Sequence, residues 1–243
     1  MPRLNPFRPT SPIGPGMFVG RLREIDQLDQ ILLQAAAGEA LHFALTGERG
    51  IGKSSLLLYM QELAKGALVP LQLNNRALRF VVVHTDINEG TSALGLMGRI
   101  ELGLRKTLAE VDPGRSLLTQ AWSFLQRIET SVGSIRPATK SADAEVLLDE
   151  FAFSLAETAK RLCESSQVDP MHFDGILILI DECDHAPMEL RLGALLKLTI
   201  ERLQRRAATR SCLGWRELQG SAKCLRAATS LRQGVSSGCI WSD

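Results

Sequence analysis

The chain has 243 residues, 45% of them hydrophobic, and a formal net charge of +1 at pH 7. This length allows one large α/β domain or two small ones, and the apolar content suits a globular core. The near-neutral charge excludes a strong overall field for nucleic acid or membranes, although a local patch is compatible with it. No apolar stretch is long enough to span a bilayer, and prolines stand where a signal peptide needs an apolar segment. We therefore expect a cytoplasmic protein.

The N-terminal part predicts an arm followed by a helix. Residues 1–16 contain five prolines, which predict an extended arm. After the segment 17–21, apolar residues recur at helical spacing until Gly38, where we expect the helix to end. The apolar positions are Leu22, Ile25, Leu28, Ile31 or Leu32, and Ala35.

A glycine-rich segment follows, between a predicted strand and a predicted helix. Residues 41–46 are mostly apolar and predict a short buried strand, and residues 55–65 predict a helix that ends at Gly66. The residues between them fit the phosphate-binding pattern G-x-x-x-x-G-K-[ST]. They are Gly47, Glu48, Arg49, Gly50, Ile51, Gly52, Lys53 and Ser54.

The residue types in this loop suit a triphosphate. Its glycines let the main chain wrap the phosphates, and backbone N–H groups up to Ser55 at the helix N-terminus favour anions. Lys53 supplies a mobile cation to the β- and γ-phosphates, and Ser54 offers a hydroxyl to Mg²⁺. We therefore predict that residues 47–55 bind the nucleotide. The alternative is a glycine-rich turn before an ordinary helix.

Two acids follow an unbroken apolar run at residues 175–180. Such runs are typical of strands buried on both faces of a parallel sheet, and ligands bind at the carboxyl ends of these strands. We predict that Asp181 holds Mg²⁺ through water and that Glu182 polarises the attacking water, which makes Glu182 and Lys53 the candidate catalytic residues. The alternative is a strand followed by a helix-capping acid. Residues 79–86 predict another strand, where His84 and Asp86 either face this site or are ordinary strand-end groups.

Four more helices are predicted from apolar stripes, at residues 91–110, 116–130, 142–165 and 188–206. Pro187 fits the first position of the last one. Arg202, Arg205 and Arg206 crowd its end, where the helix dipole accounts for them better than a role as an arginine finger. The five cysteines are odd in number and lack C-x-x-C spacing, so we expect reduced, structurally minor thiols.

The segment Phe18-Val19-Gly20-Arg21-Leu22-Arg23-Glu24-Ile25 resembles the F-V-G-R-x-x-E-[IL] box that opens AAA+ ATPase domains of the origin-recognition-like type. The same box occurs in the related STAND ATPases. With the P-loop and the acids of a Walker B pattern, the resemblance covers roughly residues 17–206. It implies an α/β fold, the P-loop NTPase three-layer α/β/α sandwich with a mainly parallel sheet. It also implies ATP as the ligand, with Phe18 and Val19 near the adenine, and GTP is disfavoured because an N-K-x-D motif is missing.

The segment 207–243 has no regular apolar pattern, and only residues 209–215 suggest a strand. In the family that the chain resembles, a strand between the P-loop strand and the Walker B strand ends in a polar sensor residue. Another strand and a helical lid come later. Residues 209–215 are the candidate for the inserted strand, and no segment stands out for the rest. We therefore expect a sheet that is incomplete at its C-terminal end. This irregular tail is either a truncated or out-of-frame end or a divergent C-terminus.

These observations leave two functions open. The first is Mg²⁺-dependent ATP hydrolysis that drives a conformational switch in the core at residues 17–206. The second is a nucleotide-gated binding or scaffold module with little or no turnover. A protein partner is expected in either case but is not identified by the residues. Direct binding to nucleic acid is disfavoured, because the charge is near neutral and no winged-helix segment is present.

Overall fold

The computed structural model describes residues 21–39, 41–69, 77–111, 141–164, 173–205, 211–218 and 237–241. These residues contain a five-stranded sheet with the order β2-β3-β4-β1-β5. Each pairing in this sheet is parallel. The strands are β1 (His42–Gly47), β2 (Phe80–Asp86), β3 (Gly175–Asp181), β4 (Ser211–Leu218) and β5 (Ser237–Trp241).

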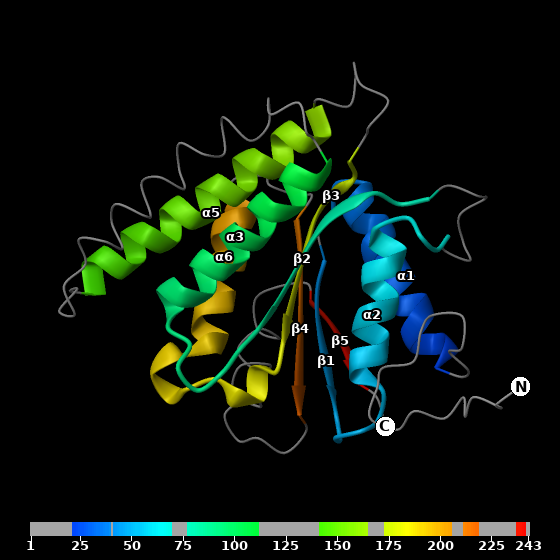
Figure 1. Cartoon of the computed structure of the whole chain (residues 1–243), viewed down its shortest axis with the longest axis horizontal. Coiled ribbons are helices and arrows are strands. Elements are labelled where there is room, and N and C mark those ends of the chain that lie inside the picture. The colour runs from blue at the N-terminus through cyan, green and yellow to red at the C-terminus, as the bar shows by residue number, and fades with distance from the viewer. Residues whose placement is uncertain are drawn as a thin grey trace, which may run out of the picture.

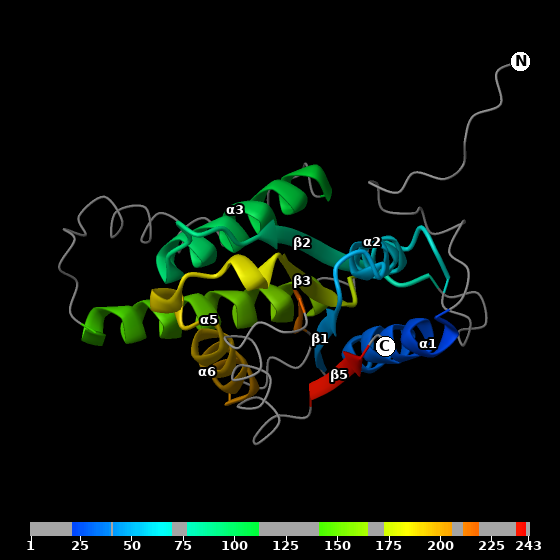
Figure 2. The ribbon, with the colours of Figure 1, turned by 90° about the horizontal axis from the view of Figure 1, so that it is seen from below.

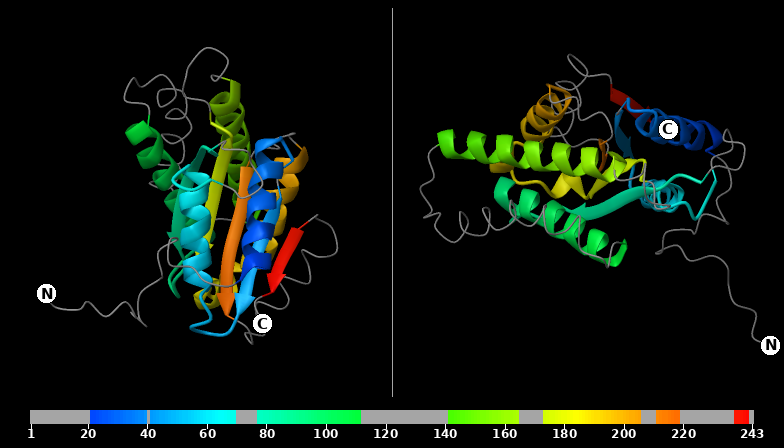
Figure 3. Two further views of the ribbon diagram at one scale, coloured as in Figure 1. Left: turned by 90° about the vertical axis from the view of Figure 1, so that its right-hand side faces the viewer. Right: turned by 90° about the horizontal axis from the view of Figure 1, so that it is seen from above.

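Helices cover both faces of the sheet (Figures 1 and 2). One face carries α1 (Leu22–Ala36) and α2 (Lys53–Ala64), and the other carries α3 (Ala93–Val111), α5 (Ser141–Glu164) and α6 (Leu192–Arg205). Alternate residues of β3 belong to separate cores, since Leu177 and Leu179 pack with α1 and α2 while Ile178 packs with the other three helices. The fold is therefore the predicted three-layer α/β/α sandwich, and Figure 3 shows its layers from two further sides.

The first three strands lie where the sequence predicts them. β1 and β3 match their predicted ranges within one residue, and β2 begins at Phe80. Every residue of β1 is buried, and in β3 only Asp181 is partly exposed. Both strands lie inside the sheet and have helices on both faces, which explains why their sequences do not alternate between polar and apolar residues.

The C-terminal strands correct the prediction of an irregular tail at residues 207–243. β4 lies between β1 and β3, as expected for residues 209–215, so neither of these two strands lacks a neighbour. β5 was not predicted at all, and it pairs with the other side of β1. It contains only five residues, two of them Ser237 and Gly238, and is too short to show a strand period. Its place is set by pairing with β1.

The helices largely agree with the prediction. Gly38 and Gly66 end α1 and α2 with positive φ angles of 99° and 80°. In α1 the N–H group of Glu39 donates to the carbonyl of Gln34, at 2.8 Å, which is the bond of a Schellman motif. Leu22 is 71% exposed, so the buried stripe of α1 starts at Ile25 instead. The helix predicted at residues 116–130 lies outside the described residues.

The last predicted helix, at residues 188–206, begins later than expected. Met188–Leu190 form a 3-10 helix, and Arg191 has a positive φ of 44°, so α6 starts only at Leu192. Pro187 precedes the 3-10 turn in an extended conformation and therefore does not occupy the first position of the α-helix. A residue in the left-handed region cannot continue a right-handed helix, which is the reason for the break.

Two glycines of α3 predict opposite changes in stability. A Cβ atom at Gly103 would lie 2.7 Å from Cγ1 of Val83, a stiff side chain buried in β2. We expect Gly103→Ala to lower the free energy of unfolding by about 1–3 kcal/mol. At Gly98 an added Cβ would meet no described atom within 4 Å, so Gly98→Ala is the matched control and should raise it by about 0.5–1 kcal/mol. Urea denaturation measures both, and equal stabilities of the two variants would contradict the clash.

His42 predicts a pH dependence of stability. This first residue of β1 is 1% exposed, and burial lowers its pKa from 6.5 to about 4. The unfolded chain therefore binds the proton more readily, and the free energy of unfolding falls as the pH drops from 6.5 towards 4. Between about pH 7 and pH 4.5, protonation of His42 in the unfolded chain should lower the free energy of unfolding by an amount on the order of 2 kcal/mol. His42→Gln should remove this part of the slope in urea denaturation, and an unchanged slope would assign the pH dependence to other groups.

Candidate active site

The predicted phosphate-binding loop joins β1 to α2. Gly50 and Gly52 have positive φ angles of 84° and 98°, which favour glycine. At either position an added Cβ would meet no atom of the described chain within 4 Å, so the loop borders open space. Gly52 is the N-cap of α2, and among the described residues no side chain caps that helix end. A helix N-terminus at this position favours an anion.

Lys53 lies beneath this loop. It is the first residue of α2 and only 3% exposed. Its Nζ donates to the carbonyl oxygen of Gly47, at 2.8 Å, and to that of Glu48. Ser54 is half-buried and Ser55 is buried in the same first turn of the helix. The loop therefore holds a buried ammonium group beside the helix N-terminus.

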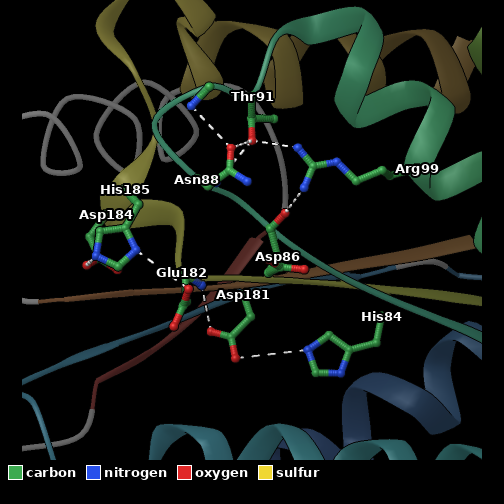
Figure 4. Close-up of polar contacts among 10 residues, drawn as sticks. His84, Asp86, Asn88, Thr91, Arg99, Asp181, Glu182, Asp184 and His185 are labelled. Carbon is green, nitrogen blue, oxygen red and sulfur yellow. Dashed lines mark hydrogen bonds and ion pairs between the residues drawn. The ribbon is translucent and has the colours of Figure 1, made fainter.

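The two acids lie at the carboxyl end of β3 (Figure 4). Asp181 ends the strand, and its Oδ1 accepts the N–H of Glu182 at 2.6 Å. Glu182 has the left-handed angles φ 55° and ψ 36° and starts the 3-10 helix η3 (Cys183–His185). Such a conformation is uncommon for a residue with a side chain and turns the chain sharply out of the sheet. The end of the strand and the turn together place both carboxylates at the carboxyl end of β3.

The sheet brings the two acids and the glycine loop to the same end of its parallel strands and to the same face. Asp181 follows the alternation of Leu177 and Leu179, which face α1 and α2, so its side chain lies on the side that α2 covers. Trp215 of β4 pairs with both Ala44 of β1 and Ile180 of β3, so Asp181 is level with Leu45, two residues before β1 ends at Gly47. With β4 between them, β1 and β3 lie about 10 Å apart. Since the strands are parallel, the loop after β1 and the acids after β3 lie at the same end of the sheet.

His84 faces this site, and the side chain of Asp86 is exposed. Nε2 of His84 is 4.0 Å from Oδ2 of Asp181, and the imidazole is 44% exposed. Asp86 pairs in register with Asp181 across the two strands, and its side chain is exposed. His84 therefore fits the interpretation that it faces the site, because it contacts Asp181, a predicted site residue.

A second polar cluster orders the loop after β2, and the sequence pattern did not reveal it. Oγ1 of Thr91, which is 2% exposed, donates to Oδ1 of Asn88 at 2.9 Å and accepts from Arg99 at 2.6 Å. Arg99 also donates to the carbonyl of Asp86, at 3.0 Å (Figure 4). The Asn-Glu-Gly sequence is a turn signal that would have located this loop. Arg99 could not be assigned, because its partners lie on another element.

The arginines at the end of α6 have a structural role where they are described. Arg202 is 15% exposed, and its Nε pairs with a carboxylate oxygen of Asp149, which joins α6 to α5. Arg205 is the last residue of α6, and Arg206 lies outside the described residues. A guanidinium that holds two helices together is a poor candidate for reaching a phosphate. The pair with Asp149 is a contact between two helices and differs from the helix-end role expected for Arg202, and for Arg205 and Arg206 that role stays a prediction.

The side chains at the site fit a nucleotide with a divalent cation. Mg²⁺ takes oxygen ligands, and Ser54 and Asp181 supply a hydroxyl and a carboxylate. The open space around the loop glycines and the buried ammonium of Lys53 fit a phosphate chain. In the described part of the chain, no group of three or more His, Cys, Asp or Glu side chains is arranged to hold a metal by itself.

A glycine loop between β1 and α2, two acids at the end of β3 and a parallel sheet define the class of P-loop nucleoside triphosphatases. The model of the AAA ATPase domain family matches residues 17–213. The chain therefore belongs to the AAA ATPase domain family and is an ATPase of the AAA+ type. No curated protein matches it. One solved structure, described as an ATPase, is 13% identical, with 90% of this chain and 80% of that chain covered and a TM-score of 0.33.

Three further predictions concern the adenine contacts, membrane-spanning helices and the cysteines. Phe18 and Val19 lie outside them, so the predicted adenine contacts stay predictions. None of the described helices is long and apolar enough to cross a membrane. Cys163 and Cys183 form no disulfide bond within the described part of the chain, and Sγ of Cys183 donates to the carbonyl oxygen of Ile180 at 3.6 Å.

Proposed function

We propose that this chain binds ATP with Mg²⁺, hydrolyses it, and uses the cycle as a conformational switch. The observation that carries the proposal is the buried ammonium of Lys53, held under a glycine loop at the start of α2. The carboxylates of Asp181 and Glu182 stand at the same edge of the sheet. A cationic cradle opposite two acids is the arrangement that phosphoryl transfer to water requires.

Each residue has a separate task in this proposal. Residues 47–55 bind the phosphates, and Lys53 exchanges the carbonyls of Gly47 and Glu48 for phosphate oxygens. Ser54 and Asp181 hold the cation, while Glu182 accepts a proton from the attacking water and aligns it. When bound, Mg²⁺ supplies positive charge that offsets the charge developing on the phosphates.

The origin-recognition-like and STAND-like character is part of the same proposal. The box at residues 18–25 leads directly into α1, where Arg21 is the N-cap and pairs with Glu24 at 3.4 Å. Helix α1 in turn packs on α2 through a buried hydrogen bond from Tyr59 to Asp29, at 2.9 Å. This bond joins the helix that continues from the box to the helix that begins at the phosphate loop. The position of Phe18 and Val19 near the adenine is proposed on the resemblance of the box alone.

The test measures ATP affinity and phosphate release on one sample, with and without Mg²⁺. We expect micromolar or tighter binding and a release rate that depends on Mg²⁺. Tight binding without release would favour the alternative, a nucleotide-gated scaffold that signals to a protein partner through occupancy alone. A sample without measurable ATP binding would refute both functions.

A further inference from the structure

A histidine stands between two carboxylates directly after β3. Nδ1 of His185 is 3.6 Å from Oε2 of Glu182, and its Nε2 is 3.6 Å from Oδ2 of Asp184. The side chain of Asp184 is only 12% exposed, whereas those of Glu182 and His185 are about half exposed, at 46% and 53%. Figure 4 shows the imidazole beside the carboxylate of Glu182. Asp184 is therefore the most buried of the three side chains, and it lies on the opposite side of the imidazole from Glu182.

The backbone fixes this arrangement. The N–H of His185 donates to the carbonyl of Glu182 at 3.0 Å, and Ala186 donates to Cys183 at 3.2 Å. Cys183 is 1% exposed and anchors the 3-10 turn in the core. The imidazole of His185 is therefore held next to the carboxylate of Glu182 by local geometry.

We propose that His185 is a positioning residue for Glu182, and that Asp184 in turn orients His185. The proposal rests on the proposed function, because it concerns the carboxylate that aligns the attacking water. A half-exposed glutamate side chain has several rotamers, and restricting them to one costs conformational entropy. An imidazole locked beside it on a rigid turn reduces the number of these rotamers before the substrate arrives.

The observed separations suit such a role. At 3.6 Å the contact between His185 and Glu182 is longer than a hydrogen bond, whose heavy atoms lie within about 3.2 Å. Contacts of this kind in substrate-free sites often shorten in the complex with substrate. An imidazole that carries a proton on both nitrogens donates from Nδ1 to Glu182 and from Nε2 to Asp184, whose carboxylate then fixes the plane of the ring. The same logic orients the base in other groups of three catalytic side chains.

The experiment compares His185→Ala and His185→Asn in steady-state ATP hydrolysis. We expect His185→Ala to lower kcat about tenfold with KM for ATP unchanged, because only the orientation of Glu182 is affected. Asparagine keeps an N–H donor near the position of Nδ1, so His185→Asn should restore most of the rate. In the Glu182→Gln background the effect of His185→Ala should disappear. Glu189→Gln, an exposed carboxylate on the next turn, is the matched control and should leave kcat unchanged.

Each other outcome overturns the inference. An unchanged kcat in His185→Ala, or a higher one, would mean that His185 does not orient Glu182 for catalysis. An equal loss in the Glu182→Gln background would assign the effect to the fold or to another residue. These failures differ from a failure of the proposed function, in which the unaltered protein neither binds nor hydrolyses ATP.

Discussion

Replacing Lys53 with alanine is expected to abolish measurable ATP binding. Lys53 is 3% exposed, and its ammonium donates to the carbonyl oxygens of Gly47 and Glu48 in the glycine loop. A charge-assisted contact to phosphate in a buried site contributes several kcal/mol, which corresponds to a loss of affinity of at least about 100-fold. Isothermal titration calorimetry with ATP and Mg²⁺ measures the change directly.

The control for Lys53→Ala is Lys65→Ala. Lys65 is exposed and follows the opposite end of the same helix, α2, so its loss removes one positive charge without touching the loop. Circular dichroism and the melting temperature of both variants show whether the fold is retained. A folded Lys53→Ala protein that binds ATP as tightly as the Lys65→Ala protein would refute the assignment of the phosphate-binding loop.

Local chemistry explains why the loop and the acids could be found in the sequence. Gly50, Gly52 and Lys53 act through the backbone of one short segment, so their spacing alone specifies the turn and the helix start. The apolar run before Asp181 is unbroken because β3 lies between two other strands and two helix layers. Both signals depend on neighbours along the chain or on complete burial, and both are visible without a structure.

Features that depend on distant pairing were missed. β5 is recognised by its parallel pairing with β1 and not by its own five residues. The contact between His84 and Asp181 depends on the register of β2 against β3, which puts both side chains on the face of α2. The late start of α6 follows from the left-handed conformation of Arg191, a residue type with no preference for that region. For β5 and His84 the decisive contacts are made with distant parts of the chain, which a sequence pattern does not contain.

Replacing Glu182 with glutamine is expected to separate binding from hydrolysis. Glutamine has nearly the same shape and keeps the oxygen that contacts the solvent, but it cannot accept a proton from water at neutral pH. The phosphate-binding loop joins β1 to α2 and does not include the altered residue, so ATP affinity should stay within about threefold. Phosphate release should fall by a factor of about 100 or more, since the group that activates water is lost. Calorimetry and a phosphate-release assay on the same sample provide both numbers.

The backbone at Glu182 allows the side chain to be changed without a change in the main chain. Glu182 has a φ of 55°, and its N–H donates to Asp181, so the substitution leaves the main chain and the candidate cation ligand unchanged. Glu189→Gln provides the same chemical change on the exposed turn that follows and should have no effect on either measurement. If Glu182→Gln hydrolyses ATP at the rate of the unaltered protein, another group must activate the water. If the unaltered protein itself binds ATP tightly but releases no phosphate, the site acts through nucleotide occupancy, and the two acids serve the cation alone.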